Sequence, residues 1–316
     1  MARFLARRLL LAGLMLVVIS IATFLLFVVA LPGGNPAPLI AGRLATPAEV
    51  HLISVRYGFD KPLWIQYIKT MANIFNGSAY SYNQGFNVLT EIKDGFPVTL
   101  SLALGAGFFW MLSSIALGTI AAVRSGKYQD RVLTVLAMVG VSMPPFFFGS
   151  LVIYFLGYKA GILPLQGYVS LVSNPAQWFW HLIGPWLTLS ILFIGFYSRV
   201  LRSSILNAMS EDYVRTARAK GLSERRVLVK HILRLSLLPV ISLFGLDMAQ
   251  VIGGGAILTE SVFGLHGVGY LAYEAVGNFD TVTLLEIVML TALAVVLMSA
   301  LIDIMYAVLD PRIRLT

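Results

Sequence analysis

The charged side chains of this sequence gather in one stretch, residues 210–239, which reads SEDYVRTARAKGLSERRVLVKHILRLSLLP. Ser210 is a suitable N-cap for a first short helix, with Glu211 in the first turn, where the helix dipole favours negative charge. Gly221 stands where a left-handed residue commonly ends a helix, and Ser223 can cap a second one. Helices this short are not stable alone in water, so the stretch predicts a docking segment laid into a partner's groove.

Small residues and cations have different expected roles in this segment. Ala217 and Gly221 are four residues apart, on one face of the short helix or at its end, and are small enough to enter a groove. Arg215, Arg218 and Lys220 flank them and can pair with carboxylates around the rim, which adds orientation more than affinity. The simpler alternative is a basic loop that fixes membrane orientation and touches lipid headgroups.

Nothing in the sequence indicates bond-making chemistry. There is no phosphate-binding loop of the form GxxxxGK[ST], so ATP is not bound by that route. The four histidines lack metal-ligand spacing, cysteine is absent, and no nucleophile, base and orienting acid form a set. Residues 264–269, GLHGVG, match a dinucleotide-binding GxGxxG only superficially, because no strand precedes them. We therefore expect that this chain is not an enzyme.

The composition indicates a membrane protein. Of the 316 residues, 58% are hydrophobic and 12% charged, and the mean hydropathy is +0.83. Soluble domains carry about a quarter charged residues. A net charge of +8 would suggest a nucleic-acid partner for a soluble protein, but in a membrane protein the enrichment of Lys and Arg in cytoplasmic loops is the simpler cause.

Six apolar runs are long enough to cross a membrane. The first exceeds the roughly 20 residues that the hydrocarbon core requires, and it is too long for the apolar part of a signal peptide. The six predicted transmembrane helices occupy residues 9–31, 98–123, 132–158, 182–198, 235–258 and 282–309.

The distribution of Lys and Arg predicts the orientation of these helices. Most of the basic residues precede residue 9, lie at 124–131 or 199–234, or follow residue 309, whereas the loop 259–281 has none. By the positive-inside rule, both termini and the charged stretch are cytoplasmic. Residues 32–97 then lie outside, and their helix signals, such as Thr46 as a cap before Pro47, favour a small docked subdomain over a plain spacer.

One carboxylate falls near the middle of the membrane. Asp247 lies about eight residues beyond Pro239 in the fifth span, where an unpaired charge is costly. It either lines a pathway and meets a positive group of the substrate, or it makes an interhelical hydrogen bond, and the sequence leaves both open.

Two further patterns predict bends within the membrane. Pro144 and Pro145 should kink or break the third span, either for packing or where it contacts substrate. The glycines 253–255 predict a close-packing or bending site, rather than an anion-binding nest.

Four segments resemble, in order and spacing, the permease subunits of binding-protein-dependent ABC importers of the dipeptide, oligopeptide and nickel branch. The segments are EDYVRTARAKGLS, LLPVI, ESVFGLHGVG and DIMYAVLDPRIR. Arg215, Thr216 and Ala217 stand where the wider superfamily motif begins Glu-Ala-Ala, with Gly221 at its glycine. His231 stands in place of an isoleucine of that motif. These departures are typical of the peptide branch, and His266 stands where proline is frequent.

The resemblance implies an all-α integral membrane protein with the type I ABC importer permease fold, six transmembrane helices and a cytoplasmic coupling helix. Residues 1–96 would form an N-terminal transmembrane helix with an extracytoplasmic loop subdomain. Residues 97–316 would form a five-helix permease core with the coupling loop 199–234. The implied residues for coupling to an ATPase are Arg215, Thr216, Ala217, Arg218, Ala219, Lys220 and Gly221; the pathway candidates are Asp247, Pro144 and Pro145.

The resemblance also implies partners. The chain would form half of a translocation pathway in the bacterial cytoplasmic (inner) membrane, with a second homologous permease, two ATP-binding subunits, an extracytoplasmic substrate-binding protein and membrane lipid, and without nucleic acid. ATP and Mg²⁺ would bind to the ATPase subunits, with no cofactor in this chain. The cargo would be a dipeptide, oligopeptide, glutathione or nickel chelate. Two other classes stay open, an ion-coupled secondary transporter and a membrane scaffold without transport.

Overall fold

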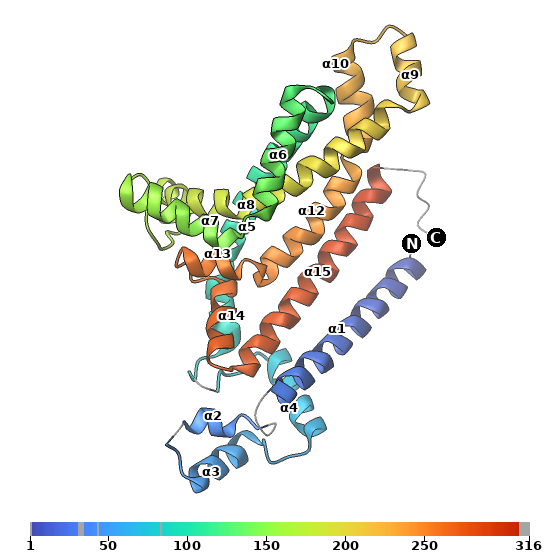
Figure 1. Ribbon diagram of the computed structural model, residues 1–316. Coiled ribbons are helices and arrows are strands. Elements are labelled where there is room, and N and C mark those ends of the chain that lie inside the picture. The colour runs from blue at the N-terminus through green and yellow to red at the C-terminus, as the bar shows by residue number, and fades with distance from the viewer. Residues whose placement is uncertain (1, 31–34, 43, 83, 310–316) are drawn as a thin grey trace.

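The computed structural model describes residues 2–30, 35–42, 44–82 and 84–309, and side chains at 10–11, 13–26, 35–42, 44–82 and 84–301. Within these ranges the chain is helical, and its one β-type pairing is an isolated bridge between Tyr80 and Asn87. The predicted all-α class is confirmed for the described part (Figure 1).

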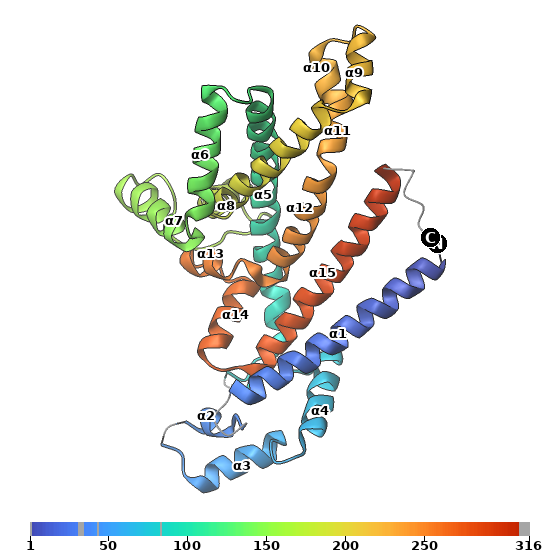
Figure 2. The ribbon, with the colours of Figure 1, turned by 45° about the vertical axis from the view of Figure 1, so that its right-hand side comes forward.

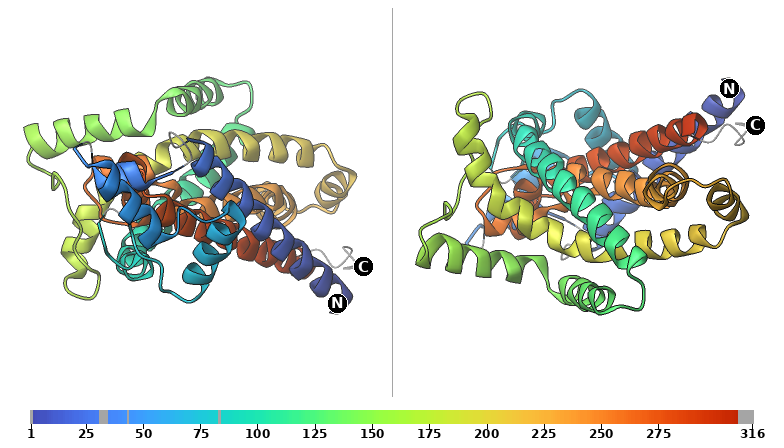
Figure 3. Two further views of the ribbon diagram at one scale, coloured as in Figure 1. Left: turned by 90° about the horizontal axis from the view of Figure 1, so that it is seen from below. Right: turned by 90° about the horizontal axis from the view of Figure 1, so that it is seen from above.

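Long apolar helices form a slanted bundle (Figure 1). In the described part four helices are long and apolar enough to cross a membrane, or five if a bent pair counts as one span. The helix α1, whose described side chains are also apolar, crosses α15 on the outside of the bundle (Figures 2 and 3). The bundle helices are α1 (Ala2–Ala30), α5 (Val88–Val123), α6 (Tyr128–Ser142), α7 (Pro145–Val152), α8 (Pro175–Met209), α12 (Leu238–Gln250) and α15 (Thr281–Leu309).

Shorter elements lie at the two ends of the bundle and between its helices. One end carries α2 (Ala37–Ala41), α3 (Pro47–Tyr57) and α4 (Leu63–Phe75), and the other carries α9 (Asp212–Ala219) and α10 (Glu224–Val227) (Figure 1). The remaining elements are η2 (Ile153–Lys159), η3 (Leu228–Ile232), α11 (Leu233–Ser236), η4 (Val251–Gly255), α13 (Ile257–Val262) and α14 (Val268–Gly277).

Two of the predicted spans begin earlier in the structure. Asn87 caps α5, accepting a hydrogen bond from the Thr90 amide at 3.0 Å, so this helix starts ten residues before the predicted position and contains Pro97. Asn174 caps α8 in the same way, through the Gln177 amide at 3.1 Å. Both helices extend beyond their apolar runs because a polar cap satisfies their first amide groups.

The double proline breaks the third span, as predicted. The segments α6 and α7–η2 meet at an angle of 99°. Met143 and Pro144 both adopt extended backbone with ψ of 119° and 130°, because each precedes a proline, and Pro145 then opens α7. The second half therefore leaves the direction of the bundle (Figure 1).

The glycines of η4 make both a bend and a close packing site, as predicted. Gly254 has a φ of +103°, which side chains rarely adopt. A Cβ on Gly253 would lie 2.6 Å from Cα of Thr291, so α15 passes directly against this backbone. The Thr291 hydroxyl donates to the Gly253 carbonyl, which the break in the helix leaves without its usual partner.

Residues 35–82 form a small helical unit that packs against α1 at one end of the bundle. Thr46 makes a capping box with Glu49 at the start of α3, with Pro47 in the first helical position, and Gly58 ends the helix with a φ of +82°. The helix α4 packs on α1 through Tyr67, whose ring lies 5.5 Å from that of Phe24.

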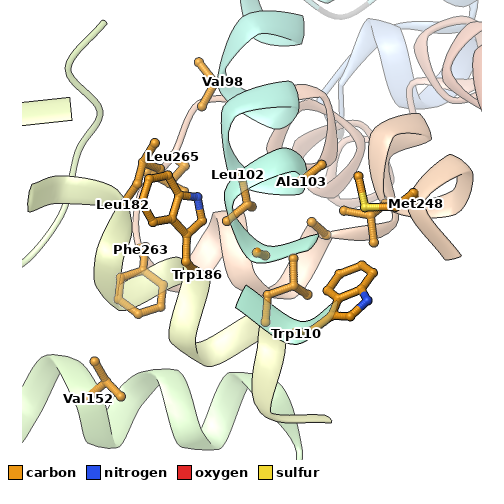
Figure 4. Packing of buried hydrophobic residues seen from close by; sticks show 14 residues of the cluster. Val98, Leu102, Ala103, Trp110, Val152, Leu182, Trp186, Met248, Phe263 and Leu265 are labelled. Atoms are coloured by element: carbon orange, nitrogen blue, oxygen red, sulfur yellow. The ribbon is translucent and has the colours of Figure 1, made fainter. Parts of the chain in front are cut away.

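Aromatic side chains fill the middle of the bundle between α5, α8 and α12. Trp110 stacks on Phe193 with ring centroids 4.2 Å apart and is fully buried. Trp186 donates from Nε1 to the Ser101 carbonyl at 3.0 Å. A Cβ on Gly105 would overlap the Trp186 ring, so the glycine admits this side chain against α5 (Figure 4).

Candidate functional site

The charged stretch forms two short helices, α9 and α10, as predicted. The predicted first cap is wrong by one residue: Glu211 precedes α9, whereas Ser210 ends α8 and donates its hydroxyl to the Asn207 carbonyl. The reason is that α8 continues to Met209 and uses Ser210 as its C-cap, so Glu211 is the first residue that can precede α9. Gly221 follows α9 with a φ of +75°, the left-handed conformation expected of it, and Ser223 precedes α10.

Ala217 faces the protein, not the outside. It is 5% exposed and belongs to a buried apolar cluster with Val214 and Val227, next to Ile205 of α8. The sequence placed Ala217 on an outward face beside Gly221, and this prediction is wrong. Val214 and Ala217 are three residues apart and form the inner face that holds α9 on the rest of the chain.

The outward face of α9 is polar and cationic. Arg218 donates to both oxygens of the Glu224 carboxylate, from Nε at 2.9 Å and from Nη2 at 3.2 Å, and thereby connects α9 to α10. Arg215 contacts Asp212 at 3.5 Å through a fully exposed pair, which contributes little to stability. The residues of the coupling candidate that remain exposed are Arg215, Thr216, Arg218, Ala219, Lys220 and Gly221.

An ion pair connects the base of this segment to the turn between α5 and α6. Arg202, near the end of α8, donates from Nε and Nη2 to the two carboxylate oxygens of Asp130, each at 2.7 Å. Asp130 also accepts from the Gly126 amide at 2.9 Å and is 5% exposed. In the described part of the chain this is the one ion pair that links side chains distant in sequence. It fixes α6 to the helix that leads into α9.

Asp247 makes an interhelical hydrogen bond. The hydroxyl of Tyr197 in α8 donates to its Oδ2 at 2.5 Å, and Tyr197 is fully buried while Asp247 is half-buried. The interhelical hydrogen bond, one of the two roles predicted for Asp247, is thus present. It leaves the other oxygen, Oδ1, without a hydrogen bond to the described residues, so the carboxylate retains one oxygen that can accept from a ligand.

The pathway candidates and the coupling candidates occupy different parts of the fold. Pro144 and Pro145 stand at the break between α6 and α7, and Asp247 lies in α12, within the bundle. The helices α9 and α10 project beyond the bundle at one end (Figure 1). The helix α8 leads into α9, and α10 leads through η3 and α11 into α12.

A buried carboxylate in α13 was missed by sequence reasoning. Glu260 of α13 is fully buried and accepts from the Thr99 hydroxyl of α5 at 2.7 Å and from the Tyr270 amide at 2.8 Å. Thr99 accepts in turn from the Val268 amide at 2.8 Å. The first amides of α14 thus all find partners in one network. A lone acid directly before the glycine-rich turn was the signal for it.

The glycines of that turn make room for the network. A Cβ on Gly267 would lie 2.5 Å from both the Thr99 hydroxyl and the Glu260 carboxylate. A Cβ on Gly95 of α5 would lie 3.1 Å from the Gly267 carbonyl carbon. Burial raises the pKa of Glu260 to about 7, against the opposing effect of its hydrogen bonds. The GLHGVG motif therefore serves close packing, and it is not a nucleotide loop.

The structure offers no metal site in its described part: no group of three or more His, Asp or Glu side chains is placed to hold an ion. The arrangement of the charged groups can bind, orient and transmit movement.

Comparisons with known proteins agree on one family. The family described as the binding-protein-dependent transport system inner membrane component matches residues 114–315, and the family of its N-terminal region matches residues 1–103. The probable peptide ABC transporter permease y4tP of Sinorhizobium fredii is 36% identical over 299 residues, covering 94% of this chain and 95% of that protein. The dipeptide transport system permease DppB of Escherichia coli is 33% identical over 339 residues, covering 99% of each.

A solved structure supports the fold. The MetNI methionine ABC transporter, in inward-facing conformations, superposes with a TM-score of 0.54 at 16% sequence identity, covering 70% of this chain and 97% of the matched chain. At that identity the likeness concerns the fold alone. Together with the family matches, which cover nearly the whole chain, it leads to one conclusion: this chain belongs to the binding-protein-dependent transport system inner membrane components.

Proposed function

We propose that this chain is the permease subunit of an ATP-driven importer of peptides and forms half of the pathway through the bacterial inner membrane. Its family membership and its relatives, which are named as permeases for peptides and dipeptides, support this function. They favour it over an ion-coupled secondary transporter and over a scaffold. The described part also lacks the several midplane charges that such transporters use.

The proposed topology has six transmembrane helices and cytoplasmic termini. Residues 32–97 lie outside and residues 199–234 lie inside, with residues 1–96 forming the N-terminal unit and 97–316 the five-helix core. The helix α1, with its N-terminal arginines, supplies the first span, and the bent pair α6–α7 supplies the third. The distribution of Lys and Arg supports the orientation.

The proposed coupling surface is the outward face of α9, residues 215–221. The observation that carries it is a short helix held from behind by Val214 and Ala217 and presenting Arg215 and Lys220 to the outside. The ATPase partner would supply ATP and Mg²⁺ and a groove with an acidic rim. When two ATPases close, this surface would be pulled, and the pair of Arg202 with Asp130 would transmit the movement to α6.

The proposed pathway runs beside Asp247 and the break at Pro144 and Pro145. The unpaired carboxylate oxygen of Asp247 supports a contact with a cationic group of the cargo. The broken helix supports a non-helical backbone segment that lines a protein cavity instead of facing lipid.

Reconstitution tests the function directly. The chain, the second permease and the two ATPases are placed in proteoliposomes with the substrate-binding protein on the outside. We expect peptide uptake that requires ATP on the ATPase side and stops when either permease is left out. Uptake that proceeds under an ion gradient without the ATPases would replace this function with secondary transport.

Cysteine labelling tests the topology. The chain has no cysteine, so Ser78→Cys and Ser223→Cys each create a single reactive site at an exposed position. We expect an impermeant maleimide to label Cys at 78 in sealed cells and Cys at 223 only after lysis. Labelling of both from one side would contradict the topology.

A further inference from the structure

The helix α4 presents three faces of different chemistry. Tyr67 packs on α1, and its hydroxyl lies 2.7 Å from that of Ser20. The face beside it is polar and consists of Gln66, Lys69, Thr70 and Asn73, at the i, i+3, i+4 and i+7 spacing of one helix side. The third face is apolar yet uncovered, with Trp64, Ile68 and Phe75 exposed by 64%, 57% and 77%.

The helix α4 lies against the apolar run of α1. Ser20 and Phe24, which α4 contacts, belong to the apolar run of α1. Figure 2 shows α4 beside the end of α1, with α3 farther from the bundle. A short amphipathic helix with an exposed tryptophan in this position has the features of a helix that inserts into the headgroup layer.

A cavity of about 190 Å³ opens behind α4, between α1, α3 and α15. One part of its wall is apolar and comes from membrane helices, through Phe24, Val282 and Leu285. Another part is polar and includes Lys69 and Asn73. No carboxylate lines this cavity. Such a wall, with an apolar side, a polar side and one cationic side chain, is suited to bind an amphiphilic molecule whose headgroup is anionic.

Lys69 has a charge that the protein does not neutralise. Among the described residues its ammonium meets only the Tyr57 carbonyl, at 3.5 Å, and no carboxylate lies within ion-pair distance. Lys61 of the same subdomain differs, because its ammonium lies 3.5 Å from Asp60. The unpaired donors of Lys69 face a cavity at the membrane surface, where phosphate groups are concentrated.

We propose that α4 seats its subdomain in the headgroup layer and that the cavity behind it binds an anionic phospholipid. The phosphate lies at Lys69, with Asn73 beside it; the glycerol region enters the cavity beside Phe24, and the acyl chains stay in the surrounding lipid. The absence of a carboxylate in the wall selects against a headgroup that carries its own ammonium. Trp64, Ile68 and Phe75 contact the surrounding lipid.

Lipid retention tests the binding site. The full transporter is reconstituted in nanodiscs with equal phosphatidylglycerol and phosphatidylcholine, extracted in mild detergent, and its bound lipid is counted by native mass spectrometry. We expect Lys69→Gln to lower retained phosphatidylglycerol about fivefold, the effect of one basic residue beside an anionic headgroup. The control Lys61→Gln should match the wild type. Equal retention by Lys69→Gln and wild type, or no preference between the two lipids, would overturn the site.

A spin label tests the position of α4. Ile68→Cys provides a unique label site on the exposed stripe, and Ala48→Cys in α3 provides an exposed control. In the assembled transporter in nanodiscs, we expect the label at 68 to be open to oxygen and shielded from a water-soluble nickel chelate, with the reverse at 48. A label at 68 that is open to the chelate, or shielded from both reagents by a protein partner, would overturn the proposal.

Discussion

Two pairs of short helices, α9–α10 and α13–α14, use glutamate in opposite ways. In α9–α10 the Glu224 side chain is 72% exposed and connects the two helices through an ion pair with Arg218 at the protein surface. In α13–α14 the Glu260 carboxylate is fully buried and accepts from Thr99 and Tyr270. The first pair keeps its charged side chains on the surface, and the second encloses the carboxyl group of Glu260.

The difference indicates which pair can move against a partner. Exposed ion pairs contribute about 0–1 kcal/mol, so those of α9 can rearrange when another protein binds. Buried polar groups that lose a partner cost about 1–3 kcal/mol each, so the Glu260 network fixes α14 to α5. The exposed pair therefore suits the proposed docking role, and the buried pair suits rigid support.

The largest expected effect comes from crowding the buried pair. Gly267→Ala, at the N-cap of α14, places a methyl group 2.5 Å from both Thr99 and Glu260, whereas Gly277→Ala, at the end of α14, meets nothing within 4 Å. We expect the first to lower the free energy of unfolding by about 3 kcal/mol and the second to leave it nearly unchanged. The measurement is thermal unfolding of the purified proteins. Equal midpoints would mean that the junction is loosely packed.

Breaking the pair of Arg202 and Asp130 should cost somewhat less. We expect Arg202→Ala to destabilise the protein by about 2 kcal/mol, because Asp130 is buried while Arg202 is 29% exposed along its side chain. The transmitting role predicts more than lost stability: peptide uptake per ATP hydrolysed should fall. The exchanged variant Arg202→Asp with Asp130→Arg should recover part of this ratio. Unchanged coupling in stable Arg202→Ala protein would limit the pair to a structural role.

Titration of Glu260 should have a smaller effect. Its pKa in the folded protein is raised to about 7, so the protonated form is favoured by folding. The stabilisation is complete at low pH and is lost as the pH rises through about 7. Between pH 5 and 7 we expect the wild type to lose about 1–2 kcal/mol relative to Glu260→Gln, which does not titrate. A constant difference between the two unfolding curves would contradict this.

The smallest predicted effect is a change in cargo preference. Asp247→Asn keeps an oxygen that can accept from Tyr197 but removes the charge. We expect uptake of cationic peptides to fall a few-fold more than uptake of neutral ones, with assembly intact. The matched variant Tyr197→Phe removes the hydrogen bond and keeps the charge, so it should not discriminate by charge. Equal loss for all peptides in both variants would make Asp247 a structural residue.

Much of the fold could be predicted because its signals are local. The break after Met143 follows from two consecutive prolines, and the left-handed end of α9 follows from Gly221. The capping box at Thr46 needs only residues three positions apart. In each case the backbone preference of one or two residues decides the structure.

The contacts of the site could not be predicted, because they join distant segments. Arg202 and Asp130 are 72 residues apart, and Thr99 and Glu260 are 161 apart, so their pairing depends on how the helices pack. The inward direction of Ala217 was missed for the same reason. Its helix is too short for a spacing of small residues to tell the face that meets α8 from the face that meets a partner.

The central claim is that the outward face of α9 binds an ATPase. Gly221→Leu adds a bulky side chain there, with a backbone cost of about 1–2 kcal/mol for the left-handed position. Gly161→Leu is the matched control, because Gly161 also has positive φ and open surroundings but lies after α7. The measurement is the amount of ATPase that purifies with the assembled permease pair. We predict that Gly221→Leu loses the ATPases while Gly161→Leu retains them, and normal ATPase stoichiometry with normal uptake in Gly221→Leu would contradict the claim.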